Sequence, residues 1–184
     1  LFEKLPIHWM WWHALGAVAV GVVGYFAPHT MGVGYDNIKD LLTGNMPLAL
    51  LISLCVLKYI SWVISLGSGT SGGTLAPLFT IGGALGALLG VAVMKLFPGT
   101  QINIATAALI GMAAMFAGAS RALLTAIVFS METTGQPHGL LPLSGACTAA
   151  YFVSFFLMKG SIMTEKIRRR GIVAPDEYTP DIMQ

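Results

Sequence analysis

The sequence has little charge, and the shortage is concentrated in its middle. Charged residues make up 10% of the 184 residues and hydrophobic residues 55%, whereas a soluble domain carries about 25% charged residues. Lys58 is the one formal charge in residues 41–94, and Arg121 and Glu132 are the two in residues 96–158. This composition excludes a soluble enzyme, a nucleic-acid-binding protein and a disordered tail. It indicates an integral membrane protein.

Residues that form disulfides or bind metals are also scarce. The two cysteines, Cys55 and Cys147, lie inside apolar runs, where cysteine behaves as a small buried hydrophobe. The histidines lack both the spacing and the neighbouring carboxylates that zinc sites use. We therefore expect neither a disulfide nor a metal site, although the chain contains four histidines, His8, His13, His29 and His138.

The apolar runs predict an all-α membrane protein. A membrane-spanning helix needs about 20 mostly apolar residues, and four runs are long enough to cross: Trp9–Ala27, Met46–Leu66, Leu75–Met94 and Leu140–Met158. Two further apolar segments, Ile104–Ala119 and Arg121–Met131, are too short to span comfortably, and Gly118 to Ser120 suggests a break between them. A short helix is expected in Tyr35–Leu42 and a terminal amphipathic helix in Lys159–Arg170.

The basic residues cluster after the last long apolar run. Five of them lie there: Lys159, Lys166, Arg168, Arg169 and Arg170. Because basic residues near the ends of spans are held on the cytoplasmic side, we expect the C-terminus to be cytoplasmic. The chain begins with Leu1 instead of methionine, so we also expect a piece of a longer protein.

A glycine-rich segment separates two of the long spans. Residues 67–74 contain four glycines, and such a run does not form a stable helix. The helix expected after it would present unpaired N–H groups and the positive end of its dipole, which together bind anions. The donors would be the N–H groups of Thr74 and Leu75, beside Gly73. The alternative is that these glycines serve helix packing alone, as the stripe of Gly82, Gly86 and Gly90 is expected to do.

The segment Gly72-Gly-Thr-Leu-Ala-Pro77 resembles the Gly-Gly-x-Phe-x-Pro signature of the CLC family of chloride channels and proton-coupled chloride antiporters. Gly67-Ser-Gly precedes the signature and a glycine-striped helix follows it, as in the family. Residues 111–122 and Met131-Glu-Thr-Thr134 are similar to later family blocks. The resemblance extends over roughly residues 9–172.

The resemblance implies a fold and a function. It implies the second half of a CLC-type inverted-repeat membrane domain over residues 1–158, and a terminal pore-proximal helix with a cytosolic tail over residues 159–184. It implies a homodimer in the cell (inner) membrane that transports chloride or a similar anion. The transporter would be either a voltage-gated channel or an antiporter. Such a protein is no enzyme and needs no cofactor besides the transported anion.

The resemblance also implies the site residues. The anion would contact backbone at Gly73, Thr74 and Leu75, where Leu75 replaces the signature's phenylalanine. Met163 falls where the family has an anion-contacting tyrosine, and a methionine supplies no hydroxyl donor there. The family's first-half anion loop and gating glutamate do not occur in these residues. The first half of the pore is therefore an expected partner. Whether the protein is a channel or an antiporter remains open.

The isolated charges in the apolar region have simpler expected roles than anion binding. Lys58 is expected to reach the membrane surface or pair with a carboxylate, because a charge inside a bilayer is costly. Arg121 is expected to cap backbone carbonyls or brace the two short segments. Glu132 is expected to make a structural hydrogen bond.

Two other functions fit parts of the sequence. Gly69-Thr-Ser-Gly72 matches the Gly-x-Ser-Gly pattern of rhomboid-type intramembrane proteases, with Ser71 as nucleophile. Such a serine needs a histidine base within reach, and the histidine after it, His138, lies in a predicted turn. The second alternative is a membrane assembly or regulatory half-fold that transports nothing.

Overall fold

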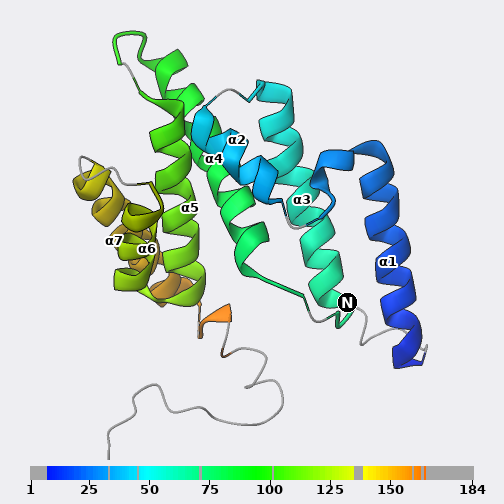
Figure 1. Cartoon of the computed structure of the whole chain (residues 1–184). Helices are drawn as coiled ribbons and strands as arrows, with labels where there is room; N and C mark the ends of the chain where they lie inside the picture. Colours follow the sequence, from blue (N-terminus) through cyan, green and yellow to red (C-terminus); the bar gives the residue numbers. More distant parts are fainter. Residues whose placement is uncertain are drawn as a thin grey trace, which may run out of the picture.

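The computed structural model describes residues 8–32, 34–44, 46–70, 72–100, 102–134, 139–158, 160–162 and 164. All regular structure in these residues is helical (Figure 1). The elements are α1 (Trp9–Phe26), the short 3-10 helix η2 (Pro28–Thr30), α2 (Tyr35–Thr43), α3 (Leu48–Gly67), α4 (Leu75–Leu96), α5 (Ile104–Ser120), α6 (Leu123–Thr134) and α7 (Leu140–Leu157). The predicted all-α class is confirmed, and the expected terminal helix lies almost wholly outside the described residues.

Three of these helices are long and apolar enough to cross a membrane: α3, α4 and α7. The apolar part of α1, Met10–Phe26, is slightly shorter, as are α5 and Leu123–Glu132 of α6. With a rise of about 1.5 Å per residue, the 17 residues of α5 do not cover a hydrocarbon core of about 30 Å. The expectation that the two segments around Gly118 do not span singly therefore agrees with their lengths.

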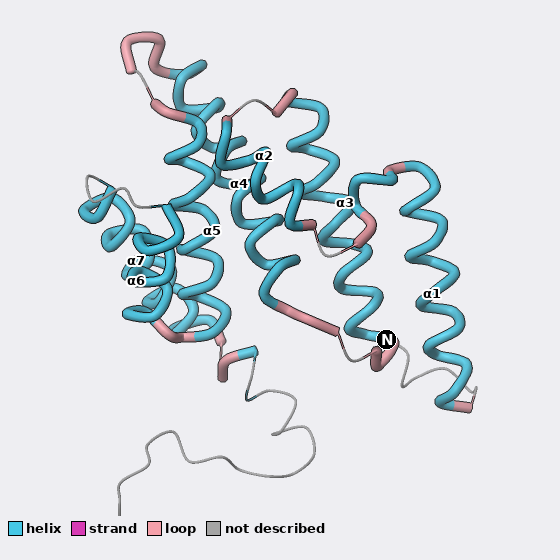
Figure 2. Tube along the Cα trace, viewed as in Figure 1, coloured by secondary structure: helices cyan, strands magenta, loops and turns pink. Residues whose placement is uncertain are grey.

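Helix α4 lies in the middle of the bundle, between α3 and α5 (Figures 1 and 2). Its contact with α5 is the most extensive in the described chain, and glycines make it close. A Cβ atom on Gly82 would lie 2.7 Å from the carbonyl oxygen of Gly111, and one on Gly86 would lie 2.9 Å from the Cα of Gly111. A Cβ on Gly90 would lie 2.9 Å from the Cβ of Ala107. The predicted packing role of this glycine stripe is confirmed.

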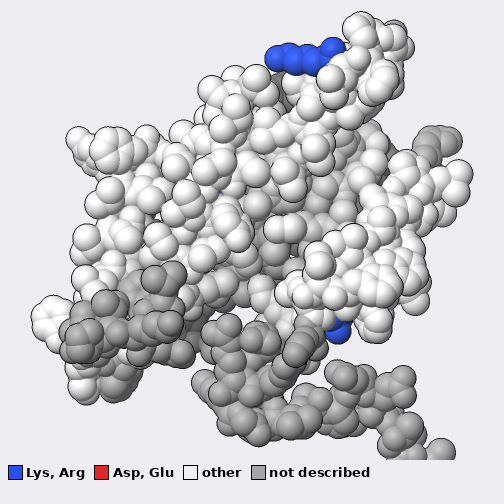
Figure 3. All heavy atoms as spheres, turned by 180° about the vertical axis from the view of Figure 1, so that it is seen from behind, with Lys and Arg blue, Asp and Glu red and all other residues white. Residues whose placement is uncertain are grey.

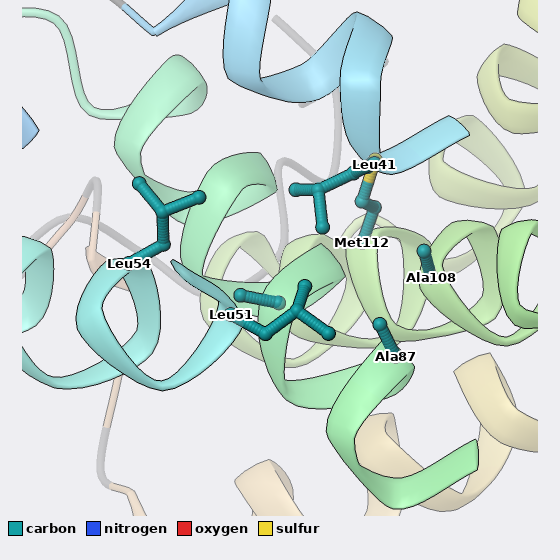
Figure 4. Close-up of a cluster of buried hydrophobic side chains, with 7 residues drawn as sticks. Leu41, Leu51, Leu54, Ala87, Ala108 and Met112 are labelled. Atoms are coloured by element: carbon teal, nitrogen blue, oxygen red, sulfur yellow. The ribbon is translucent and has the colours of Figure 1, made fainter. Parts of the chain in front are cut away.

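The apolar core between α2, α3, α4 and α5 is built from small and branched side chains (Figure 4). Its fully buried members are Leu41, Leu51, Leu54, Ala84, Ala87, Ala108 and Met112. A second buried cluster joins α5 to α6 and α7 around Leu143 and Cys147. Large hydrophobic side chains of α1, α3, α4, α6 and α7 are exposed, and the face in Figure 3 has basic groups only near its edges and no acidic group in view. Such a surface suits lipid or another apolar partner.

The junction between α5 and α6 is held by Arg121. This residue adopts a left-handed conformation, with φ of 58°, and its N–H group donates to the carbonyl of Ala117. Its guanidinium group donates to the carbonyls of Ser154, at 3.4 Å, and of Met158, at the end of α7. Arg121 therefore caps backbone carbonyls, as expected. Glu132 is exposed on α6.

Candidate functional site: the N-terminus of helix α4

Helix α4 begins without a side-chain cap. Thr74 precedes the helix with φ of −97° and ψ of −25°, and its side chain makes no capping hydrogen bond. The N–H of Leu78 donates to the carbonyl of Thr74 at 3.2 Å. By helix geometry the N–H groups of Leu75 and Ala76 have no intrahelical acceptor, and Pro77 has no N–H. The first turn therefore presents free backbone donors at the positive end of the helix dipole.

An open cavity of about 500 Å³ lies at this helix end. Gly73, Thr74 and Leu75 line it together with the next two residues of α4, and Gly32 and Tyr35, which lie before and at the start of α2, complete the lining. The structure thus brings three of the predicted site residues together. The fourth, Met163, lies outside the described residues, and so do Ser71 and His138 of the protease alternative.

The backbone at Gly72 and Gly73 is open on the side where a side chain would be. A Cβ atom added at either glycine would meet no other atom of the chain within 4 Å. Both residues are exposed. Unlike the glycines of the α4–α5 contact, these two are therefore not required for packing among the described residues, so packing alone does not account for them.

The turn between η2 and α2 forms another wall of this cavity. Gly32 and Gly34 have positive φ angles, 72° and 86°, which glycine adopts at little cost. The ammonium group of Lys58, on α3, donates to the carbonyl of Gly32 at 2.8 Å and to the carbonyl of Thr30 at 2.7 Å. Lys58 thereby ties the turn to α3 and fixes the position of this wall.

The prediction that Lys58 reaches the membrane surface or pairs with a carboxylate was wrong. The side chain is 5% exposed, so it does not reach the surface. The acidic residues of the described chain, Asp36, Asp40 and Glu132, are all exposed, so none of them pairs with it. Backbone carbonyls take the hydrogen bonds instead.

Sequence reasoning did not identify Tyr35, Gly32 or Lys58 as parts of the site. A signal for the first two was present, because Gly32-x-Gly-Tyr35 places two glycines directly before a helix. For Lys58 the signal was its spacing from Ser61 and Ser65, which puts all three side chains on one face of α3.

Another cavity, of about 290 Å³, adjoins the first turn of α4 and is lined mainly by apolar side chains. Phe79 of α4 stacks there on Phe129 of α6, with ring centroids 5.5 Å apart. Leu75 and Ala76 line this cavity too. The first turn of α4 therefore lines both the cavity at the helix end and this second, apolar cavity.

Comparison with known proteins shows the family to which this chain belongs. The family model described as voltage gated chloride channel matches residues 1–155. The chain belongs to the CLC family. Its membership agrees with the apolar helices, and the protein is an integral membrane protein.

Two curated relatives of this CLC chain carry the name H(+)/Cl(-) exchange transporter ClcA. That of Klebsiella pneumoniae (strain 342) is 32% identical over 149 residues, which cover 79% of this chain and 32% of the relative. That of Salmonella arizonae (strain ATCC BAA-731 / CDC346-86 / RSK2980) is 32% identical over 144 residues, covering 78% of this chain and 30% of the relative. The chain spans about a third of the length of these relatives.

Proposed function

We propose that the protein moves chloride across a membrane, as a channel or as a proton-coupled exchanger. The anion is held by the backbone N–H groups of Thr74 and Leu75, next to Gly73, in the cavity at the start of α4. The observation that carries this proposal is an uncapped helix N-terminus that opens on a cavity of about 500 Å³. The names of the relatives, which describe proton and chloride exchange, support the choice of ion.

Backbone donors suit transport because they bind an anion without a full opposing charge. A helix N-terminus carries roughly half an elementary charge, so a dehydrated anion is stabilised and can still leave. A guanidinium or ammonium in direct contact would hold the anion more strongly, since charge-assisted hydrogen bonds are about twice as strong as neutral ones. The open backbone at Gly73 lets the anion approach closely.

The wider assembly is part of the same proposal. These residues form the second half of the pore domain, and the first half completes the anion path. The protein functions as a homodimer in the cell membrane, with the basic residues after position 158 on the cytoplasmic side. Met163, at the position of the family's anion-contacting tyrosine, would offer the anion no hydroxyl.

The test is chloride efflux from liposomes that contain the purified protein at its natural length. Valinomycin alone clears the electrical potential through potassium, and a protonophore added with it clears a proton gradient. We expect efflux with valinomycin alone from a channel, and efflux coupled to proton movement from an exchanger. If chloride, fluoride and nitrate all remain inside under both conditions, the protein is the non-transporting half-fold and the proposal is wrong.

A further inference from the structure

Helix α3 carries a polar stripe within an apolar span. Lys58, Ser61, Ser65 and Ser68 follow one another at intervals of three and four residues, which places them on one face of the helix. Lys58 is 5% exposed, Ser61 is 9% exposed and Ser68 is 1% exposed. The stripe thus faces the protein interior instead of lipid, where it would be costly.

The first three residues of this stripe line an open cavity of about 210 Å³. Lys58, Ser61 and Ser65 line it together with residues of other segments, among them Gly32 and Gly73. A water molecule occupies roughly 30 Å³ in the liquid. The cavity therefore has room for a small anion together with several waters.

The polar groups of this cavity have unused hydrogen-bonding capacity. An ammonium group has three donors, and two of those of Lys58 are used by the carbonyls of Thr30 and Gly32. The hydroxyl groups of Ser61 and Ser65 make no hydrogen bond with any described residue. One N–H and two O–H donors thus remain for an occupant, beside a positive charge that no described carboxylate neutralises.

We propose that this cavity is a second anion site, which holds a small monovalent inorganic anion such as chloride or bromide. The ammonium of Lys58 and the hydroxyls of Ser61 and Ser65 bind the anion. Gly73 lines both this cavity and the one at the start of α4, so the two sites adjoin and an anion passes between them. This inference rests on the proposed transport function, which it extends by a waiting position on the path.

The contacts of Lys58 explain how the second site can release its anion. The two carbonyls draw on the positive charge of the ammonium and hold it in place, so the anion contacts a charge that is already partly compensated. Without them, an ion pair in a low-dielectric interior would be hard to separate. The carbonyls therefore keep Lys58 in place while the site stays weak enough for transport.

The first test is the chloride dependence of flux in Lys58 variants, measured in liposomes. Lys58→Met removes the charge and the donors, and the half-saturating chloride concentration should rise by about tenfold, the worth of one hydrogen bond to a charged group. Lys58→Arg keeps both and should stay near the unsubstituted value. Lys95→Met, which removes an exposed charge at the end of α4, is the matched control and should change nothing. A lower maximal flux with unchanged half-saturation in Lys58→Met would mean a purely structural lysine and would overturn the inference.

A second variant covers the case in which Lys58→Met does not fold. Ser61→Ala combined with Ser65→Ala removes the two hydroxyls and leaves the lysine in place. It should also raise the half-saturating concentration, whereas Ser144→Ala, at a half-buried serine on α7 whose hydroxyl donates to the carbonyl of Leu141, should not. Equal half-saturation in the double variant and the control would overturn the inference.

The direct test is the anomalous density of bromide in crystals of the protein at its natural length. Density in the cavity within hydrogen-bonding distance of the Lys58 ammonium supports the second site. Density at the start of α4 alone, or a carboxylate of the protein seated beside Lys58, overturns the second site and leaves the proposed function standing. Absence of bromide from both cavities overturns both proposals.

Discussion

Replacing Gly86 with alanine tests whether close backbone contact with α5 holds α4 in place. Alanine favours a helix over glycine by about 1 kcal/mol, so the substitution would stabilise an isolated helix. In the protein the new Cβ would meet backbone atoms of α5, with the Cα of Gly111 at 2.9 Å and its nitrogen at 3.1 Å. Backbone atoms cannot rotate aside as a flexible side chain can, so the two helices must separate.

Whether Gly86→Ala raises or lowers the free energy of unfolding depends on which effect is larger, the gain in helix propensity or the clash with α5. Overpacking costs about 1–3 kcal/mol, and a rigid backbone neighbour puts Gly86 at the upper end of that range. After the gain of about 1 kcal/mol in helix propensity, we expect Gly86→Ala to lower the free energy of unfolding by about 2 kcal/mol.

The matched control is Gly21→Ala in α1, where a Cβ would meet nothing within 4 Å. This variant has the same propensity gain without the clash, so we expect it to be neutral or stabilising by up to about 1 kcal/mol. The assay is unfolding by sodium dodecyl sulfate in mixed micelles, followed by circular dichroism. Equal free energies of unfolding for the two variants would refute the reasoning, because only the contact with α5 distinguishes them.

Three further predictions concern the site and its supports. Gly73→Val should abolish chloride flux, because Gly73 lines the cavity at the start of α4. Gly99→Val is the control and should leave flux unchanged, since a Cβ at either glycine meets no other atom of the chain and Gly99 does not line that cavity. Comparable flux in both variants would argue against the site. Leu75→Phe should leave flux within about twofold, because hydrogen bonds of the backbone hold the anion; a large change would mean a side-chain role. Arg121→Lys should lower the free energy of unfolding by about 1 kcal/mol, because the carbonyls of Ser154 and Met158 lose hydrogen bonds from a charged donor, and an unchanged melting temperature would contradict this.

The helices could be predicted from the sequence because each depends on local composition. Apolar runs, glycine clusters and prolines gave the ends of α1, α3, α4 and α7 to within two residues. The break between α5 and α6 was also expected, although it falls at Arg121 and the residue after it. Its place depends on the bonds of Arg121 to carbonyls of α7, which are distant in sequence.

The site could be predicted only on the side that belongs to α4. The glycine-rich segment and Pro77 predicted a helix start with unpaired N–H groups, and the structure has a cavity there. The wall formed by the turn between η2 and α2 could not be predicted, since Lys58 holds it through the carbonyls of Thr30 and Gly32. Every residue has a carbonyl, so the sequence gives no sign of which carbonyls a buried lysine will choose.

The central claim is that the backbone at the start of α4 binds chloride, and calorimetric titration of chloride into the purified protein tests it most directly. The protein at its natural length and its Gly99→Val variant should bind chloride with equal stoichiometry. Gly73→Val should bind at least one chloride fewer per chain, because its side chain fills the approach to the N–H groups of Thr74 and Leu75. No binding by the unsubstituted protein, or equal stoichiometry in all three proteins, would contradict the claim.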